Sequence, residues 1–270
     1  MPATPEAITS PRHRPPSPAR ALPEEAAVAL AFDGAVQAVM MASPADLEDF
    51  AVGFALTEGI ARPCPDPEIV RHAAGIELRV WLGAHDAAAL RDRRRATLGP
   101  VGCGLCGIES LDEALRPPPS VSGDALSLCA ADLPRAEALL RAAQPMRAAT
   151  GAVHAAGLYV PGSGPGRGMV MVREDVGRHN ALDKLAGALA RAGLRASEGA
   201  VVLTSRVSVD LVQKAAMMGA PALLAVSAPT ALAVAAAEAA GITLVTGIGR
   251  PAPEIHSHAR RVRRPEERTP

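Results

Sequence analysis

The second half of the chain alternates between predicted strands and predicted helices, and this alternation limits the folds open to it. Short apolar runs that are typical of buried strands occur at 153–160, 168–174, 199–204, 221–226 and 241–245. Segments with helical periodicity follow directly after strands, at 178–192, 208–218 and 229–240. Strands that alternate with helices over short links form a largely parallel sheet with helices packed on it. We therefore expect an α/β domain over residues 121–262.

Composition indicates which side chains form the core and argues against nucleic acid as a general partner. The 270 residues are 49% hydrophobic and only 2% aromatic, so the core must be packed from Ala, Val, Leu and Met side chains. A chain of this length can form one large domain or two modest ones. The formal net charge is zero. Because no overall positive field gathers phosphates, a general nucleic-acid-binding protein is not expected.

The segment before the α/β domain predicts a smaller α+β domain over residues 27–98. Two short strands flank Asp33-Gly34, a pair that favours a tight hairpin turn. Ser43-Pro44 is typical of a helix N-cap followed by proline at the first helical position, and Gly59 is placed to end that helix. A further strand is predicted at 76–82.

The ends of the chain predict no ordered domain and no targeting signal. Residues 1–26 are rich in proline and contain no apolar run suited to a signal peptide, so we expect a disordered tail and a cytoplasmic protein. Residues 263–270 are expected to form a second tail. No charged residue lies between Lys214 and Glu238. This stretch is rich in Ala and is interrupted by Pro and Gly. Strand, turn and helix therefore explain this stretch better than a membrane span.

The two thiols of Cys103 and Cys106 lie in a loop with glycine at 102, 104 and 107. Glycine permits many backbone conformations, so we expect a mobile loop and connector over residues 99–120. A C-x-x-C pair is compatible with half of a zinc site, with a redox disulfide, or with a nucleophilic cysteine that carries sulfur. The other cysteines, Cys64 and Cys129, are isolated from each other. The third interpretation therefore fits best, and no structural metal is expected.

Polar and charged residues gather where three predicted strands lead into helices. The first junction carries Arg178, His179, Asn180, Asp183 and Lys184, the second carries Ser205, Arg206, Ser208 and Lys214, and the third carries Ser227 and Thr230. In the first helix, Leu182, Leu185 and Leu189 occupy the predicted buried face. We therefore expect Asn180, Asp183 and Lys184 to be free to meet a ligand or solvent. Helix N-termini with guanidinium and hydroxyl groups favour anions such as phosphates.

Each of these residues also has a purely structural interpretation. Ser208 and Ser227 would serve as plain N-caps, and His154 and His179 would make structural hydrogen bonds. Glu174, Asp175, Arg178 and Lys184 would form a surface ion network. The repetition of similar residues at three consecutive junctions favours an anion site.

Several motifs resemble the formate dehydrogenase accessory sulfurtransferase family (FdhD). They are Cys103–Gly107, Thr150–Ala156, Arg173–Lys184, Ser205–Ser208 with Val212–Ala215, Asp46–Phe54 and Ser227–Val234. The matches occur in order over about residues 27–260. The resemblance implies a fold similar to the cytidine deaminase α/β sandwich, preceded by a smaller domain, and a homodimer.

The resemblance also implies a function. Family members accept sulfur from a cysteine desulfurase as a persulfide on the C-x-x-C loop. They pass it to the molybdenum or tungsten bis-pterin guanine dinucleotide cofactor of formate dehydrogenase. Cys103 matches the persulfide cysteine and Cys106 the second cysteine. Cofactor contacts are expected at His154, Arg178, His179, Asn180, Lys184, Ser205, Arg206, Ser208, Lys214, Ser227, Thr230, Gly247, Ile248, Gly249, Arg250, Pro251 and Ala252. In this last segment the chain lacks the family's Gly-Phe pair.

Two other classes of function remain open at this point. A zinc hydrolase on a deaminase-like scaffold needs His-x-Glu before its cysteine pair. Here Ala155-Ala156 follow His154 and the cysteine pair comes earlier in the chain. A chaperone that binds the cofactor without transferring sulfur is the other alternative. Metal analysis of the purified protein distinguishes a zinc hydrolase from a sulfurtransferase. Substitution of Cys103 by Ala distinguishes a chaperone, which would keep its function, from a sulfurtransferase, which would lose it.

Overall fold

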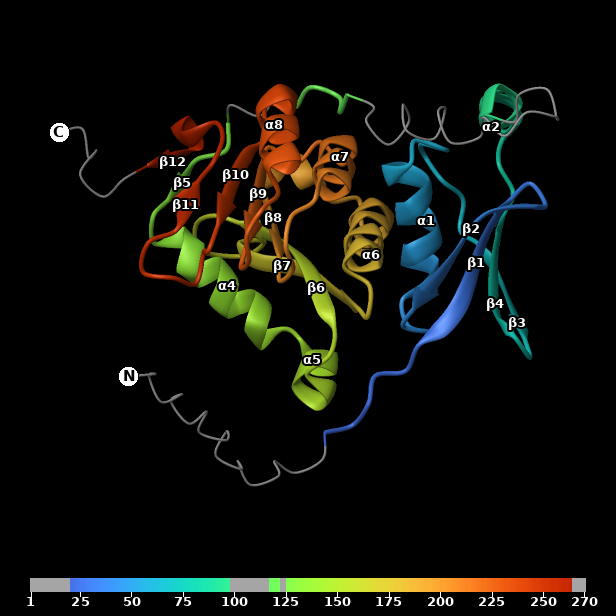
Figure 1. Ribbon diagram of the computed structural model, residues 1–270, viewed down its shortest axis with the longest axis horizontal. Coiled ribbons are helices and arrows are strands. Elements are labelled where there is room, and N and C mark those ends of the chain that lie inside the picture. Colours follow the sequence, from blue (N-terminus) through green and yellow to red (C-terminus); the bar gives the residue numbers. More distant parts are fainter. Residues whose placement is uncertain (1–19, 98–116, 122–124, 264–270) are drawn as a thin grey trace, which may run out of the picture.

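The computed structural model describes residues 20–97, 117–121 and 125–263, and these form two main sheets with helices on them (Figure 1). The first sheet contains β1 (Ala26–Phe32), β2 (Ala35–Ala42), β3 (Glu68–His72) and β4 (Gly75–Val80), in the order β2-β1-β4-β3. Asp33 and Gly34 both have positive φ and form the hairpin turn between β1 and β2, as the Asp-Gly pair predicts. One face of this sheet packs on α1 (Leu47–Thr57) around Phe32, Phe50 and Leu78. The helix α2 (Ala84–Thr97) follows β4.

The second sheet has six strands and lies between two layers of helices. Its strands are β6 (His154–Val160), β7 (Gly168–Asp175), β8 (Ala200–Leu203), β9 (Ala222–Ala225), β10 (Thr243–Thr246) and β11 (Glu254–Ile255), in the order β11-β10-β9-β8-β6-β7. β7, β8, β9 and β10 run in one direction, whereas β6 and β11 run against them. The strands predicted from the sequence match these limits within two residues. The mixed α/β fold is therefore confirmed, while the deaminase-like form and the proposed domain limits stay predictions.

Helices cover both faces of the six-stranded sheet. α6 (Arg178–Arg191), α7 (Val209–Met217) and α8 (Ala231–Ala240) pack on one face through Leu182, Leu211 and Ala237. α4 (Asp132–Ala142) packs on the other face through Leu133, Ala136 and Leu140, and α5 (Pro145–Thr150) follows it. Short pieces complete the fold: β5 (Leu128–Cys129), β12 (Val262–Arg263), η1 (Ala196–Glu198) and η2 (Ala259–Arg261).

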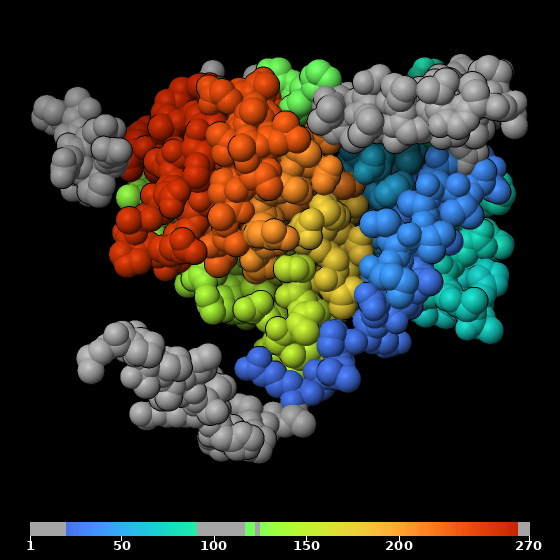
Figure 2. All heavy atoms as spheres, in the orientation of Figure 1, coloured from blue at the N-terminus to red at the C-terminus, as the bar shows by residue number. Residues whose placement is uncertain are grey.

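The two sheets are joined by the contact between α1 and α6. At the crossing, Gly53 of α1 lies against the backbone of Asp183 and Gly187, and Gly187 of α6 lies against Asp49 and Gly53. A Cβ atom at either glycine would overlap backbone atoms of the other helix. Figure 2 shows α6 as a narrow strip between the N-terminal and C-terminal parts of the molecule. The helices therefore meet backbone to backbone, with no side chain between them.

Two further expectations concern the helix start and the charge-poor stretch. The prediction that Ser43 caps the first helix is wrong: the helix begins at Leu47 after Asp46, and Ser43 is buried against β7 instead. The stretch after Lys214 forms β9 and α8, as strand and helix were predicted there. In the part of the chain that the structure describes, no helix combines the length and apolarity needed to cross a membrane.

The glycine crossing gives a test of the fold. Gly187→Ala would favour α6 by about 1 kcal/mol through helix propensity. The new Cβ would overlap the carbonyl oxygen of Asp49, so we expect a net loss of at least about 2 kcal/mol in the free energy of unfolding. Urea denaturation measures this loss. Gly83→Ala, where no atom lies within 4 Å of the new Cβ, is the matched control and should change stability little. A fully stable Gly187→Ala protein would show that the helices can separate at no cost.

Candidate functional site

One edge of the six-stranded sheet gathers most of the residues predicted to bind an anion. β7, β8, β9 and β10 end there, and β6 begins there because His154 pairs with Asp175 in the β6–β7 register. The segments that follow these strands lead into α6, α7 and α8. Ligands of open α/β sheets bind at this carboxyl edge.

The N-terminus of α6 contributes Arg178 and His179. Both are partly buried, and neither Arg178 Nε nor His179 Nε2 has a hydrogen-bond partner among the described residues. The nearest carboxylate to His179 Nε2 is Asp210, at 3.7 Å. Buried polar atoms normally have partners. Arg178 Nε is therefore suited to a ligand that accepts a hydrogen bond, and His179 Nε2 donates or accepts one according to its tautomer.

The histidines at this edge are in a positive environment. Burial lowers the pKa of His154, and the charges of Arg178 and Arg147 lower it further. Burial also lowers the pKa of His179, again with a contribution from Arg178. Burial is the largest cause of both shifts, and together with the arginine charges it favours the neutral imidazole at both positions. An anion at the edge would reverse this balance.

The loops after β8 and β9 lie side by side at the same edge. Val207 and Pro229 form an isolated parallel bridge, and the N–H of Thr230 donates to Val207 O at 2.9 Å. Ser208 precedes α7 as its N-cap residue, but its hydroxyl donates to Asp210 rather than capping the backbone. Thr230 caps α8 through its hydroxyl oxygen, which accepts from the N–H of Ala233.

The remaining residues of these loops differ in exposure. Ser205 is buried and donates to Arg206 O, whereas the side chain of Arg206 is exposed. Ser227 is half-buried. Arg206 therefore presents a positive charge at the surface of this edge.

The segment from Gly247 to Ala252 follows β10 and reaches the same edge. Gly247 has φ 66°, and Arg250 N–H donates to Gly247 O, so the chain turns sharply here. Ile248 is fully buried and its N–H donates to Ala225 O at the end of β9. Gly249, Arg250, Pro251 and Ala252 are exposed. The structure thus brings this segment together with the loops after β8 and β9.

The expectation that Asn180, Asp183 and Lys184 are free to meet a ligand is wrong. Lys184 and Asp175 are fully buried and form an ion pair at 2.6 Å, and Lys184 Nζ also donates to Ser43 O. Asp175 accepts hydrogen bonds from the N–H of Ser43 and from the Asn180 side chain. Asn180 donates a second hydrogen bond to Met41 O at 2.8 Å. These groups therefore connect β7 and α6 to the end of β2.

Lys214 is also turned inward rather than toward the edge. Its ammonium donates to Asp183 at 2.9 Å, to Glu58 at 2.6 Å and to the hydroxyl of Thr57. Burial alone would lower the pKa of Lys214, but the carboxylates of Asp183 and Glu58 outweigh it and raise that pKa. The lysine is thus held charged between α7, α6 and α1. A contact between Lys184 or Lys214 and the cofactor would require these pairs to open.

The physical reason is that α6 has no free face. Its residues from Asn180 to Leu189 are all buried, because the sheet covers one side and α1 covers the other. Periodicity identifies the face toward the sheet, but it cannot reveal that a second helix packs on the opposite face. Polar residues on that face therefore pair inside the protein instead of meeting solvent.

Sequence reasoning missed Arg147 in α5, whose charge acts on His154. The helix α5 is positioned by Glu174, which accepts hydrogen bonds from the N–H groups of Met146 and Arg147, both at 2.8 Å. This short helix precedes β6, so it is not part of the alternation of strands and helices that the sequence analysis identified. Pro145, at its first position, was the signal that a helix begins there.

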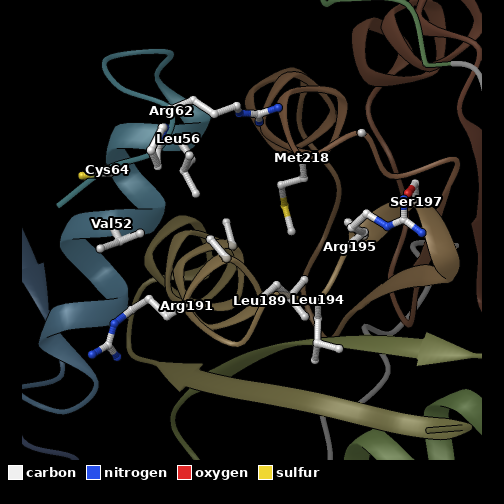
Figure 3. A pocket seen from close by; sticks show the side chains of 15 residues that line it. Val52, Leu56, Arg62, Cys64, Leu189, Arg191, Leu194, Arg195, Ser197 and Met218 are labelled. Atoms are coloured by element: carbon white, nitrogen blue, oxygen red, sulfur yellow. The ribbon is translucent and has the colours of Figure 1, made fainter. Parts of the chain in front are cut away.

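The predicted catalytic cysteines, Cys103 and Cys106, lie outside the described residues. Cys64 follows α1 and is one of the residues that line a cavity of about 580 Å³, and Figure 3 shows its sulfur on the side of α1 that faces away from α6. Burial, with help from Asp66 and Asp86, raises the pKa of the Cys64 thiol to about 12. A thiol with this pKa stays protonated at neutral pH and is a poor nucleophile. Cys129 is exposed.

The fold is that of an α/β protein, and the edge of its six-stranded sheet carries the partly buried Arg178 and the exposed Arg206. The FdhD/NarQ family model matches residues 23–263, and the chain belongs to this family.

Relatives with known names agree with this assignment. The chain is 50% identical over 246 residues to the "Sulfur carrier protein FdhD" of Agrobacterium fabrum, which covers 90% of this chain and 89% of the relative. It is 47% identical to the protein of the same name from Cupriavidus necator, over 88% of this chain and 82% of the relative. Its structure matches that of a protein from Desulfotalea psychrophila assigned as a formate dehydrogenase accessory protein. That match has a TM-score of 0.66 and 26% identity over 90% of each chain.

The buried Asp175–Lys184 pair generates a stability prediction. Asp175→Asn would leave the Lys184 ammonium buried without a countercharge, so we expect a loss of about 3–5 kcal/mol in the free energy of unfolding. Lys184→Met should cost a similar amount, and the double variant should cost less than the sum of the two. Denaturant unfolding measures all three. Arg195→Ala, at an exposed pair with Glu198, is the control and should change stability little. Single variants as stable as the control would show that the pair is not required.

Proposed function

We propose that this protein is a sulfurtransferase that carries sulfur as a cysteine persulfide. Cys103 takes the sulfur from a cysteine desulfurase, and the protein transfers it to the molybdenum or tungsten bis-pterin guanine dinucleotide cofactor, its substrate. The recipient enzyme is formate dehydrogenase, and the protein acts in the cytoplasm as a homodimer. Membership of a family whose relatives are named sulfur carriers supports the first part of this proposal.

The observation that carries the proposal is the positive edge of the six-stranded sheet. The cofactor contains two pyrophosphates. The edge offers Arg178 and His179, each with a nitrogen that has no partner among the residues the structure describes, together with the exposed Arg206. The N-termini of α7 and α8 open beside them. Backbone N–H groups at helix N-termini and guanidinium groups are the usual donors to phosphate.

The first transfer step needs only thiol chemistry. The Cys103 thiolate attacks the outer sulfur of the persulfide on the desulfurase. The sulfur–sulfur bond of the donor breaks, and the donor cysteine leaves as a thiolate. Cys106 is close enough in sequence to assist, and the roles of the two cysteines are separated by substituting each in turn.

Mass spectrometry of the protein after incubation with a cysteine desulfurase and cysteine tests the carrier step. We expect one added sulfur atom, removable by thiol reductants, on the peptide that contains Cys103 and Cys106. Cys64 should stay unmodified because its thiol is protonated, and Cys129 should stay unmodified because it lacks the glycine-rich setting of the loop. Cys103→Ala should abolish both the adduct and the activation of formate dehydrogenase. Equal labelling of all four cysteines, or full activation by Cys103→Ala, would contradict the proposal.

The anion site is tested by nucleotide binding. GDP is a partial mimic of one half of the cofactor and should bind at the edge. Arg178→Ala or Arg206→Ala should weaken GDP binding by roughly tenfold or more, because each removes a charged hydrogen bond to phosphate. Isothermal titration calorimetry measures the change. Arg195→Ala, at the opposite edge beside η1, should bind GDP as the unmodified protein does. Unchanged binding by both edge variants would place the ligand elsewhere.

A further inference from the structure

The cavity that Cys64 lines lies at the amino end of the six-stranded sheet, away from the edge with Arg178 and Arg206. Ser197 and Gly219, which precede β8 and β9, are among its lining residues. Its other walls are α1, the last turns of α6 and the end of α7 (Figure 3). Its volume of about 580 Å³ is within the range of about 300–1,000 Å³ that ligand pockets have. An occupant of this cavity would therefore not compete for space with a ligand at the carboxyl edge.

The cavity arises because two parallel helices differ in length. β7 and β8 run in the same direction, and α6 and α7 follow them. α6 has 14 residues, whereas α7 has nine. At about 1.5 Å per residue, α6 therefore extends about 7 Å farther than α7. The last turns of α6 thus face space that α7 does not fill, and the side chains of Ala186 and Ala190 are too small to fill it.

The wall of the cavity is apolar. It contains Leu56, Ala186, Leu189, Ala190, Leu194 and Met218. Leu194 is 38% exposed, and Leu56 and Met218 are half-buried. Leu194 is held here by the end of α6, because Gly193 has φ 67° and the N–H of Leu194 donates to Leu189 O at 2.8 Å. Apolar side chains exposed around a concave surface are typical of sites that take apolar groups of a binding partner.

The polar part of the lining is positively charged. Arg62, Arg191 and Arg195 line the cavity, and none of the described residues that line it is Asp or Glu. Arg191 is committed to other elements, because it pairs with Asp49 at 2.8 Å and with Asp66 at 2.9 Å. The charges of the other two arginines therefore decide what the cavity can take.

Arg62 and Arg195 supply positive charge that an occupant can reach. Arg62 donates to the carbonyl oxygen of Met217 at the end of α7, and it forms no ion pair with a carboxylate in the part of the chain that the structure describes. Arg195 pairs with Glu198, but both side chains are exposed, so this pair contributes little. Figure 3 shows the two arginines on different sides of Met218. Apolar wall therefore lies between two guanidinium groups.

We propose that this cavity is a docking site for an acidic segment of a partner protein. Apolar side chains of the segment enter the cavity, and carboxylates on either side of them pair with Arg62 and Arg195. Charge complementarity selects this occupant, because a basic segment would place its charges against two guanidinium groups. A small apolar acid has one carboxylate and would reach one arginine only, whereas a segment with two acidic residues reaches both. This inference goes beyond the proposed function and does not depend on it.

Fluorescence polarisation on the full chain tests the site with three labelled synthetic peptides. In the first peptide, two leucines are flanked by glutamates. The second has lysines in place of the glutamates, and the third has serines in place of the leucines. We expect the first peptide to bind at least tenfold more tightly than the other two, because one of these loses the charge pairs and the other loses the apolar contacts. Inorganic pyrophosphate and GDP should not displace the first peptide, and decanoate should compete at least tenfold more weakly than the unlabelled peptide.

Variants of the cavity locate the binding. Arg62→Glu combined with Arg195→Glu should reverse the preference, so that the lysine peptide binds more tightly than the glutamate peptide. Ala190→Phe, at an exposed position of the wall, should weaken binding of the first peptide by tenfold or more because the ring fills the cavity. This variant keeps the test informative if the double variant does not fold. Arg167→Glu, at an exposed arginine between β6 and β7 that does not line the cavity, is the matched control and should bind all three peptides as the unmodified protein does.

Four results would overturn the inference. The first is that the glutamate peptide binds no better than the other two, or that the cavity variants bind it as the unmodified protein does. Displacement by GDP or pyrophosphate would place the acidic segment at the carboxyl edge instead. Decanoate that competes as well as the peptide would make the occupant a small apolar acid. Loss of a dimer in the double variant, without peptide binding to the unmodified protein, would make it a second copy of this chain. The persulfide and GDP-binding measurements test the proposed function separately from all four.

Discussion

The buried ion pair between Asp175 and Lys184 is the interaction on which the rest of the structure depends. It lies where β7, α6 and the end of β2 meet, and hydrogen bonds join it to the backbone of Ser43 and to the side chain of Asn180. Buried charges are stable only when they are paired and hydrogen-bonded. The network therefore fixes the path of the chain from the first sheet to α1, and fixes the start of α6, where Arg178 and His179 lie.

The stretch from Arg173 to Lys184 contributes residues both to the protein interior and to the edge of the six-stranded sheet. Between Arg173 and Lys184, Arg173 pairs with Asp49 of α1, Glu174 holds the N-terminus of α5, and Asp175 pairs with Lys184. Arg178 and His179, in the middle of the same stretch, lie at the edge, and each has a nitrogen without a partner in the part of the chain that the structure describes. The density of charged residues here thus has two causes. One set pairs with neighbouring elements and holds them in place, whereas the other set lies at the edge of the sheet.

The order of strands and helices could be predicted because their patterns are local. Each strand of the second sheet is a short apolar run, and each following helix has a periodic apolar face, so both were found within two residues. The inward positions of Lys184 and Lys214 could not be predicted, because they depend on α1, more than a hundred residues away in the chain. Ser43 was missed for the same reason: its partner, Asp175, is 132 positions distant.

The glycine contact between α1 and α6 also limits how one sheet can move against the other. Helices that touch at a single point can act as a hinge, but ion pairs join this junction at both ends of α1. Lys214 binds Asp183 and Glu58 at one end, and Asp49 binds Arg173 and Arg191 at the other. A rotation about the crossing would have to break one of these sets. The glycine contact and the two sets of ion pairs therefore hold the two sheets in one relative orientation.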